Sequence, residues 1–299
     1  MIIDAHVHRY PEEVFENPLA FASTQGEDHW AKLVSPIGKP SLQGWANRET
    51  MLADMDEAGV EKAIMLGWYW ENPKTCEIHN RWHAEWILED PERFIAFASI
   101  NPTDEQKAID ELKFARDHGF RGIGEILPAV QGFSMQDRSW LKVVEFAVNE
   151  GWPINFHVSD PVSEPLVGNV PTPFEDFLWL ADNYPELKII LAHFGGLLPF
   201  HELNKHFRKS STNIFYDLAA GPLLYNSKTL SAVVEIVGSK KLLFGSDYPL
   251  RLYPNKSSQP DFKSYLSEIQ SMDLPEFTLM EILGGNIAHI LEMQAVAKG

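Results

Sequence analysis

The 299-residue sequence has little cysteine, no long hydrophobic run and few basic residues. Its single cysteine, Cys76, cannot form an internal disulfide, which excludes a disulfide-stabilised fold and is typical of a reducing cytoplasm. No segment approaches the roughly twenty apolar residues that span a membrane. The first residues lack the basic and apolar regions of a signal peptide. We therefore expect a cytoplasmic protein that is neither exported nor inserted into a membrane.

Acidic residues outnumber basic ones, with 42 Asp and Glu against 25 Lys and Arg and a formal net charge of −17. Nucleic-acid binding depends on Lys and Arg that neutralise phosphates, so this balance argues against a nucleic-acid partner. A small molecule is the expected ligand. The 44% hydrophobic content, with 9 Trp and 18 Phe, is that of a protein with a large core.

Short β-branched runs alternate with segments of helical periodicity along most of the chain. The runs predicted as strands are Ile2–Val7, Lys62–Gly67, Phe94–Ile100, Gly122–Leu127, Ile154–Val158, Ile189–His193, Ile214–Leu218 and Leu242–Gly245. The segments predicted as helices are Glu49–Ala58, Thr75–Leu88, Glu105–His118, Ser139–Asn149, Phe174–Asn183, Leu198–Phe207, Ser227–Val237 and Phe262–Gln270. This strict alternation predicts an α/β protein, a closed (β/α)8 TIM barrel, with a doubly wound open sheet as the alternative.

Two segments depart from the alternation. Residues 10–45, rich in Pro, Gly, Ser and aromatics, are predicted to form a long loop insertion over the barrel mouth, with a packing or dimer-contact loop as the alternative. Residues 271–299 are predicted to form a C-terminal helical extension, from periodic apolar residues in Phe277–Leu283 and Ile287–Met293. The sequence contains no clear linker, so residues 1–299 are expected to form a single domain, and pairing into a homodimer is left open.

Five side chains that could bind a metal end or follow predicted strands: His6, His8, His157, His193 and Asp247. The C-terminal ends of barrel strands converge on one face, so residues distant in sequence can line one pocket there. The alternation of a strand also places both histidines of the HxH pair on the same face. An HxH pair alone fits a structural role equally well, but the joint placement favours a divalent metal such as Zn, Mn or Fe.

The segments around these residues resemble motifs of the amidohydrolase superfamily. They are DAHVH (Asp4–His8), NFHVS (Asn155–Ser159), LAHFGG (Leu191–Gly196), FGSDYP (Phe244–Pro249) and, near the end, GGNIAHIL (Gly284–Leu291). The match is specifically to the amidohydrolase 2 branch, which includes aminocarboxymuconate semialdehyde decarboxylase, related aromatic-acid decarboxylases and lactonases. The resemblance spans nearly the whole chain, and its motifs are specific for the family and weak for the substrate.

The resemblance implies that His6, His8, His157 and Asp247 bind the metal, while His193 polarises the substrate or holds a second ion. Zinc is the first candidate, manganese and iron are alternatives, and one or two ions are expected. A divalent ion lowers the pKa of bound water, which provides a nucleophile at neutral pH. Asp247 would accept the proton of that water and pass it to a leaving group.

Further candidates follow the same strand ends. Glu125, at the end of the fourth predicted strand, is a candidate metal ligand, with a hydrogen bond to a ligand or an ordinary ion pair as alternatives. Arg251 has the geometry to bind a substrate carboxylate, or could form a surface ion pair. Trp68 and Trp70 are predicted to wall the pocket, with core packing as the alternative.

For three remaining side chains, a role in the fold is the main interpretation. Asp4 is expected to orient the strand end or an imidazole, or to cap a turn. His79 and His83 lie four apart on a predicted helix, but the segment lacks the glutamate of the HExxH motif, so packing is favoured over metal binding.

The residues favour a hydrolase that uses metal-activated water on a small polar amide, lactone or ester. Non-oxidative decarboxylation of a small carboxylated substrate is the alternative, in which the metal stabilises developing negative charge. A metal-binding scaffold without catalysis is the lesser alternative, because fold does not guarantee activity. Two ions would favour hydrolysis, whereas one ion fits both reactions.

Overall fold

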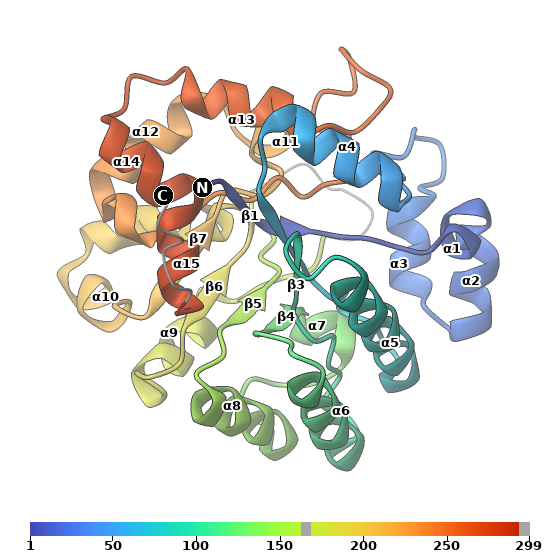
Figure 1. The fold of residues 1–299 in the computed structure, drawn as a ribbon. Helices are drawn as coiled ribbons and strands as arrows, with labels where there is room; N and C mark the ends of the chain where they lie inside the picture. The colour runs from blue at the N-terminus through green and yellow to red at the C-terminus, as the bar shows by residue number, and fades with distance from the viewer. Residues whose placement is uncertain (163–168, 293–299) are drawn as a thin grey trace.

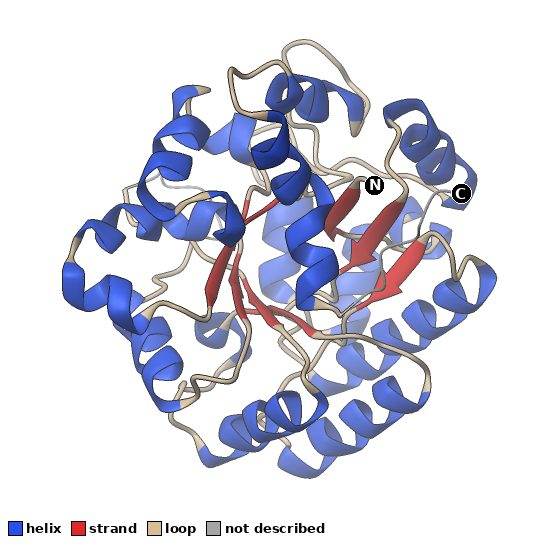
Figure 2. Ribbon diagram, turned by 60° about the vertical axis from the view of Figure 1, so that its left-hand side comes forward, coloured by secondary structure: helices blue, strands red, loops and turns tan. Residues whose placement is uncertain are grey.

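The strands form a ring that the helices surround, in the computed structural model that describes residues 1–162 and 169–292 (Figure 1; Figure 2). The strands are β1 (Ile3–Val7), β2 (Lys62–Met65), β3 (Phe94–Ala96), β4 (Ile123–Ile126), β5 (Ile154–Phe156), β6 (Ile189–Leu191), β7 (Ile214–Asp217) and β8 (Leu242–Leu243). Each lies inside a predicted run, so every strand prediction is confirmed, although the predicted runs extend beyond the hydrogen-bonded residues.

The strands pair in parallel with their sequence neighbours. One sheet has the order β1-β2-β3, and the other has the order β4-β5-β6-β7-β8. The two sheets meet where Ala98 pairs with Ile123. At the opposite junction, the Ala5 N–H donates to the Phe244 carbonyl over 2.8 Å, and Val7 pairs with Tyr248. The chain therefore forms the predicted TIM barrel rather than an open sheet, whose two edge strands would lie apart.

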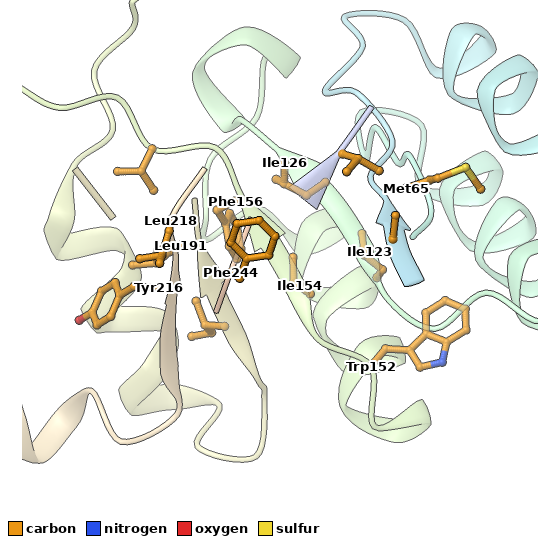
Figure 3. Packing of buried hydrophobic residues seen from close by; sticks show 14 of the residues in the cluster. Met65, Ile123, Ile126, Trp152, Ile154, Phe156, Leu191, Tyr216, Leu218 and Phe244 are labelled. Carbon is orange, nitrogen blue, oxygen red and sulfur yellow. The ribbon is translucent and has the colours of Figure 1, made fainter. Parts of the chain in front are cut away.

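Apolar side chains fill the space between strands and helices. Ile123, Ile154 and Phe156 are completely buried there, and Figure 3 shows them beside other residues of the same cluster. Burial of this kind contributes about 25 cal/mol for each Å² of apolar surface removed from water. The β-branched and aromatic residues that predicted the strands thus also hold the helices on the barrel.

Seven of the eight predicted helices are present, and several helices were not predicted. The helices are α1 (Glu12–Glu16), α2 (Pro18–Gln25), α3 (Asp28–Val34), α4 (Arg48–Ala58), α5 (Pro73–Glu89), α6 (Glu105–Asp117), α7 (Pro128–Gln131), α8 (Arg138–Glu150), α9 (Phe174–Asn183), α10 (Lys205–Ser210), α11 (Gly221–Leu224), α12 (Lys228–Val237), α13 (Lys263–Gln270), α14 (Glu276–Met280) and α15 (Asn286–Ile290). Segments of 3-10 helix are η1 (His193–Leu203) and η2 (Ser239–Lys241), and η3 (Glu281–Gly285) is π-helical.

The prediction of one helix over Leu198–Phe207 is wrong. The chain instead forms η1 and then starts α10 anew, because the Asn204 side chain accepts hydrogen bonds from the backbone N–H groups of His206 and Phe207. Pro199 inside η1 also lacks a backbone N–H to donate. A helix cap inside a periodic segment therefore divides it in two.

The prediction of a loop over residues 10–45 is also wrong in its internal structure, because residues 12–34 form α1, α2 and α3. Their apolar side chains pack in a cluster with Trp70 and Cys76, which follow β2. The buried carboxylate of Glu27 accepts hydrogen bonds from the N–H groups of Glu71 and Asn72. The insertion is thereby fixed beside the carboxyl ends of the first two strands.

The C-terminal helices close the opposite end of the barrel. Ile287 and Ile290 of α15 pack with residues of the barrel interior. Lys188, just before β6, donates to the Ile290 carbonyl, and Arg121, just before β4, donates to the Leu291 carbonyl. The predicted helices beyond α13 are thus present, while residues 293–299, with the end of the Ile287–Met293 prediction, lie outside the described residues. The C-terminal segment therefore covers the amino ends of the strands.

Across the described ranges, no helix has both the length and the apolar character needed to cross a bilayer.

His79 and His83 are completely buried on α5, which confirms the packing interpretation. Burial lowers the pKa of His79, with a smaller effect of His83, and burial lowers the pKa of His83 to about 3. Both rings are therefore neutral in the folded state, whereas an unfolded histidine binds a proton below about pH 6.5. The unfolded state then binds more protons, so stability is lost as the pH falls below that value.

We expect His79→Gln to weaken this acid sensitivity, because Gln can accept the hydrogen bond that Trp70 Nε1 donates to His79 Nδ1 but does not titrate. Urea unfolding between pH 7.5 and 5.5 should show a slope smaller by about 1 kcal/mol per pH unit than in the wild type. His118→Gln, at an exposed position, should leave the slope unchanged. Equal slopes for His79→Gln and the wild type would show that His79 is not held neutral.

Candidate metal centre

His6 and His8 are oriented by hydrogen bonds on the outer side of each ring. His6 Nδ1 donates to Asp217 Oδ2 over 3.0 Å, and His8 Nδ1 donates to the Leu66 carbonyl over 3.3 Å. Since these oxygens accept hydrogen bonds, Nδ1 is protonated in each ring, and Nε2 is the nitrogen that is left to bind a proton or a metal ion. The two Nε2 atoms lie 3.2 Å apart. Two lone pairs that face each other at this distance repel, unless a cation or a proton lies between them.

Carboxylates complete this group. Asp247 Oδ1 lies 3.7 Å from His6 Nε2 and 3.6 Å from His8 Nε2. Glu125 Oε2 lies 3.5 Å from His8 Nε2. Two ligand atoms that bind one divalent ion at tetrahedral angles are separated by about 3.4 Å. The donor set and its spacing therefore fit a divalent cation held by His6, His8 and Asp247, whose ligand atoms all lie within 4.8 Å of one another.

A second group lies beside the first. His157 Nδ1 is 3.3 Å from Glu125 Oε1 and 3.1 Å from His193 Nε2. His193 Nδ1 donates to the Ala219 carbonyl over 3.2 Å, so its Nε2 lone pair also faces the centre. Glu125 Oε1 is 3.8 Å from that Nε2 and 3.7 Å from His6 Nε2. The structure thus gathers all six predicted ligands, but it places His157 beside Glu125 and His193.

Asp217 contacts this group of side chains, although the sequence did not raise it above other residues at strand ends. Its carboxylate, completely buried at the end of β7, accepts hydrogen bonds from His6 Nδ1, Asn155 Nδ2, and the N–H groups of His193 and Ala219, all at 3.0 to 3.1 Å. Burial favours the neutral acid, but His6 outweighs burial and lowers the pKa of Asp217. Its position at a strand end was the available signal, because the sequence does not show which imidazole it meets.

The loop after β8 is fixed to β1 through the backbone. Asp4 Oδ1 accepts hydrogen bonds from the N–H groups of His6 and Ser246, both at 3.0 Å. The Asp247 N–H donates to the His6 carbonyl over 2.9 Å. Asp247 also has a φ of 68°, a left-handed conformation that is uncommon outside glycine. Asp4 therefore orients the strand end, and the left-handed backbone at Asp247 belongs to the turn that places its carboxylate beside His6 and His8.

The titratable groups of this site are buried close together, and their pKa values are raised in some groups and lowered in others. Burial raises the pKa of Asp247 to about 7. Burial also disfavours the imidazolium of His6, but Asp217 and Glu125 outweigh it and raise the pKa of His6 to about 10. Burial, reinforced by His157, lowers the pKa of His193 to about 3. Protons and a divalent cation would therefore compete for this site.

The predicted substrate-binding residues take different places. Trp68 is half-buried, and its ring lies 5.2 Å from that of His8. Arg251 Nη2 donates to the Ser41 carbonyl, which ties the insertion to the loop after β8. Trp70 is completely buried and packs in the cluster between α1–α3 and α5, so its predicted place in the pocket wall is corrected to a core position.

The family model described as amidohydrolase (Amidohydro_2) matches residues 3–292. The chain belongs to the amidohydrolase family. This confirms the resemblance carried by the HxH, His, His and Asp motifs. The relatives of this amidohydrolase are enzymes, so the family places the chain among enzymes of the amidohydrolase superfamily.

Two characterised relatives are decarboxylases. The 2-amino-3-carboxymuconate-6-semialdehyde decarboxylase of Dictyostelium discoideum is 25% identical over 264 residues, which cover 76% of this chain and 70% of that protein. The gamma-resorcylate decarboxylase of Polaromonas sp. (strain JS666) is 22% identical over 291 residues, which cover 75% of this chain and 86% of that protein.

Two solved structures share the fold. The 5-carboxyvanillate decarboxylase of Sphingomonas paucimobilis has a TM-score of 0.74 at 18% identity, with 98% of this chain and 99% of that chain covered. The dihydroxybenzoic acid decarboxylase of Polaromonas sp. JS666, solved with manganese and the inhibitor 2-nitroresorcinol, has a TM-score of 0.68 at 18% identity, with 98% of each chain covered. At this identity the likeness establishes the TIM barrel of this amidohydrolase.

We expect Asp217→Asn to reduce metal affinity about 10- to 100-fold, because Asn has one acceptor oxygen and must turn its NH2 group toward one of the two pairs of donors that Asp217 accepts, which disturbs the orientation of His6 or His193. Titration of the metal-free protein with Mn²⁺ measures this affinity. Asp110→Asn, at an exposed position on α6, is the matched control and should bind as the wild type does. Unchanged affinity in Asp217→Asn would show that Asp217 supports only the fold.

Proposed function

We propose that this amidohydrolase is a metal-dependent decarboxylase of a small, planar, carboxylated substrate. The observation that carries the proposal is the His6–His8–Asp247 group, whose inward lone pairs fit a divalent cation at the open end of the barrel. The sequence favoured hydrolysis, but both characterised relatives support its alternative, decarboxylation.

We propose that His6, His8 and Asp247 hold the ion, with Glu125, His157 and His193 beside it. Manganese replaces zinc as the first candidate, because the similar dihydroxybenzoic acid decarboxylase holds manganese. A divalent ion at this position would bind a substrate oxygen and stabilise the negative charge that develops as carbon dioxide leaves.

The residues of the chain are proposed to supply the proton. When the bond to the carboxylate breaks, its electron pair stays on the substrate carbon, which must then take up a proton. Asp247 Oδ2 is the proposed carrier, because Asp247 Oδ1 faces His6 and His8 while Oδ2 lies 3.9 Å from His193 Nδ1. The His193 ring is held by the Ala219 carbonyl and would orient the substrate through Nε2.

The mouth residues are proposed to bind the planar part of the substrate. Trp68 offers an aromatic face next to His8. Arg251 remains a candidate for a substrate carboxylate, although in this structure its Nη2 binds the Ser41 carbonyl. A single domain over residues 1–299 is proposed as the functional unit, and a homodimer would be compatible with it.

We expect the manganese-loaded protein to release CO2 from ortho-hydroxylated aromatic acids and to leave lactones and amides intact. Asp247→Asn should lower the turnover about 100- to 10,000-fold, because an amide cannot hold the proton. Asp182→Asn, at an exposed position of α9, should match the wild type. Cleavage of lactones or amides without CO2 release would contradict the proposal.

A second candidate function is hydrolysis at a pair of ions. It is favoured by the two oxygens of Glu125, since Oε2 faces His8 while Oε1 faces His157. A carboxylate placed in this way could bridge two ions, and paired ions are typical of hydrolytic centres.

Metal counting distinguishes the two candidates. We expect elemental analysis to find about one ion per chain for the decarboxylase, a number that Glu125→Gln preserves. Two ions in the wild type, with one lost in Glu125→Gln, would favour the hydrolase. Glu145→Gln, on the outer surface of α8, is the control for nonspecific binding and should not change the count.

A further inference from the structure

Tyr69 reaches across the barrel mouth. It follows β2, whose neighbours in the ring are β1 and β3. Its ring centroid nevertheless lies 5.1 Å from that of His157, which follows β5. Because β5 is three strands farther round the ring, the Tyr69 side chain must extend over the carboxyl ends of the strands to make this contact. The ring therefore lies above the candidate metal centre.

Trp68 supports this position from the other side. The Trp68 and Tyr69 rings stack with centroids 4.3 Å apart and planes inclined by 29°. Trp68 in turn lies 5.2 Å from His8, edge to face. The pair thus covers one imidazole from β1 and one from β5. Tyr69 is only 1% exposed, so its ring and hydroxyl are fixed by packing rather than free in solvent.

Within residues 1–162 and 169–292 the Tyr69 hydroxyl makes no hydrogen bond, and it is not among the fully buried polar atoms without a partner, so it keeps some contact with solvent at the mouth. Other buried tyrosines do have one: Tyr216 donates to Glu202, Tyr265 to the Leu218 carbonyl, and Tyr248 to Asp54. A hydroxyl on a largely buried side chain that makes no hydrogen bond within the protein can meet only the solvent or ligand that reaches it, and such groups in native proteins usually have a partner. The hydroxyl at the mouth is therefore available to a ligand.

The electrostatic surroundings keep this hydroxyl protonated. Burial raises the pKa of Tyr69, and the negative charge of Glu125 raises it further, as does that of Asp247. Tyr69 is consequently a hydrogen-bond donor at neutral pH.

We infer that Tyr69 is a substrate-binding residue whose hydroxyl donates a hydrogen bond to an anionic oxygen, carboxylate or phenolate, of the ligand at the metal centre. The inference deepens the proposed function and rests on its metal site. The stacked Trp68 and Tyr69 rings present flat apolar surface next to this donor. Together they select a planar acid that has an oxygen substituent within reach of Tyr69.

The test is the affinity of manganese-loaded protein for 2-nitroresorcinol, measured by absorbance titration, alongside CO2 release from ortho-hydroxylated aromatic acids. Tyr69→Phe removes the hydroxyl and keeps the ring. We expect it to bind the probe about 10- to 100-fold more weakly, the loss typical of a hydrogen bond to a charged group. Tyr253→Phe, whose hydroxyl donates to Glu268 over 2.5 Å, is the matched control and should bind within twofold of the wild type.

Metal content and unfolding temperature of each variant show whether the centre and the fold are intact. If Tyr69→Phe keeps its metal and binds the probe as tightly as the wild type, the inference is overturned, while any CO2 release leaves the proposed function standing. If binding depends on Tyr69 but no acid is decarboxylated, the inference stands and the proposed reaction fails. Absence of probe binding to the wild type would overturn the inference as well.

Discussion

Two imidazole nitrogens that face each other impose the main constraint on this protein. His6 Nε2 and His8 Nε2 lie 3.2 Å apart, and each ring is fixed by a hydrogen bond on its far side. The acceptors, Asp217 and the Leu66 carbonyl, come from different strands, so the whole ring must close before both are in place. Without a cation the facing nitrogens repel each other and destabilise the folded state, whereas a bound cation removes this repulsion. Metal binding should therefore increase the free energy of unfolding.

The architecture leaves one end of the barrel for chemistry. α15 and its hydrogen bonds with Lys188 and Arg121 close the amino ends of the strands. At the carboxyl ends, buried carboxylates and imidazoles collect at a density that would be costly without a positive charge among them. The arrangement therefore separates a stabilising end from a reactive end, as is general for this fold.

The aromatic residues after β2 connect the reactive end to the α1–α3 insertion. Trp68 and Tyr69 cover the imidazoles, while Trp70 turns away into the cluster with Trp30. Glu27 fixes the start of α5 beside them through two backbone hydrogen bonds. Three consecutive aromatic residues thus serve two purposes, because the chain turns here: the Trp70 N–H donates to the Trp68 carbonyl over 3.0 Å, and the Trp70 ring packs away from the other two.

The sequence by itself determined the strand positions, the β/α alternation and the candidate ligands, because β-branched runs, helical periodicity and the HxH spacing are local properties. It left an open sheet as the alternative, and contacts between β1 and the segment after β8 decided for the barrel. It failed at Leu198–Phe207, where the Asn204 cap competes with periodicity, and at residues 12–34, whose helices depend on packing against Trp70 and Cys76. Only the tertiary structure decided that Asp217 holds His6, that Glu125 lies between two groups, and that Tyr69 reaches His157. These contacts join strands across the ring, and the alternation of a strand fixes which face a side chain occupies but not which distant residue it meets there.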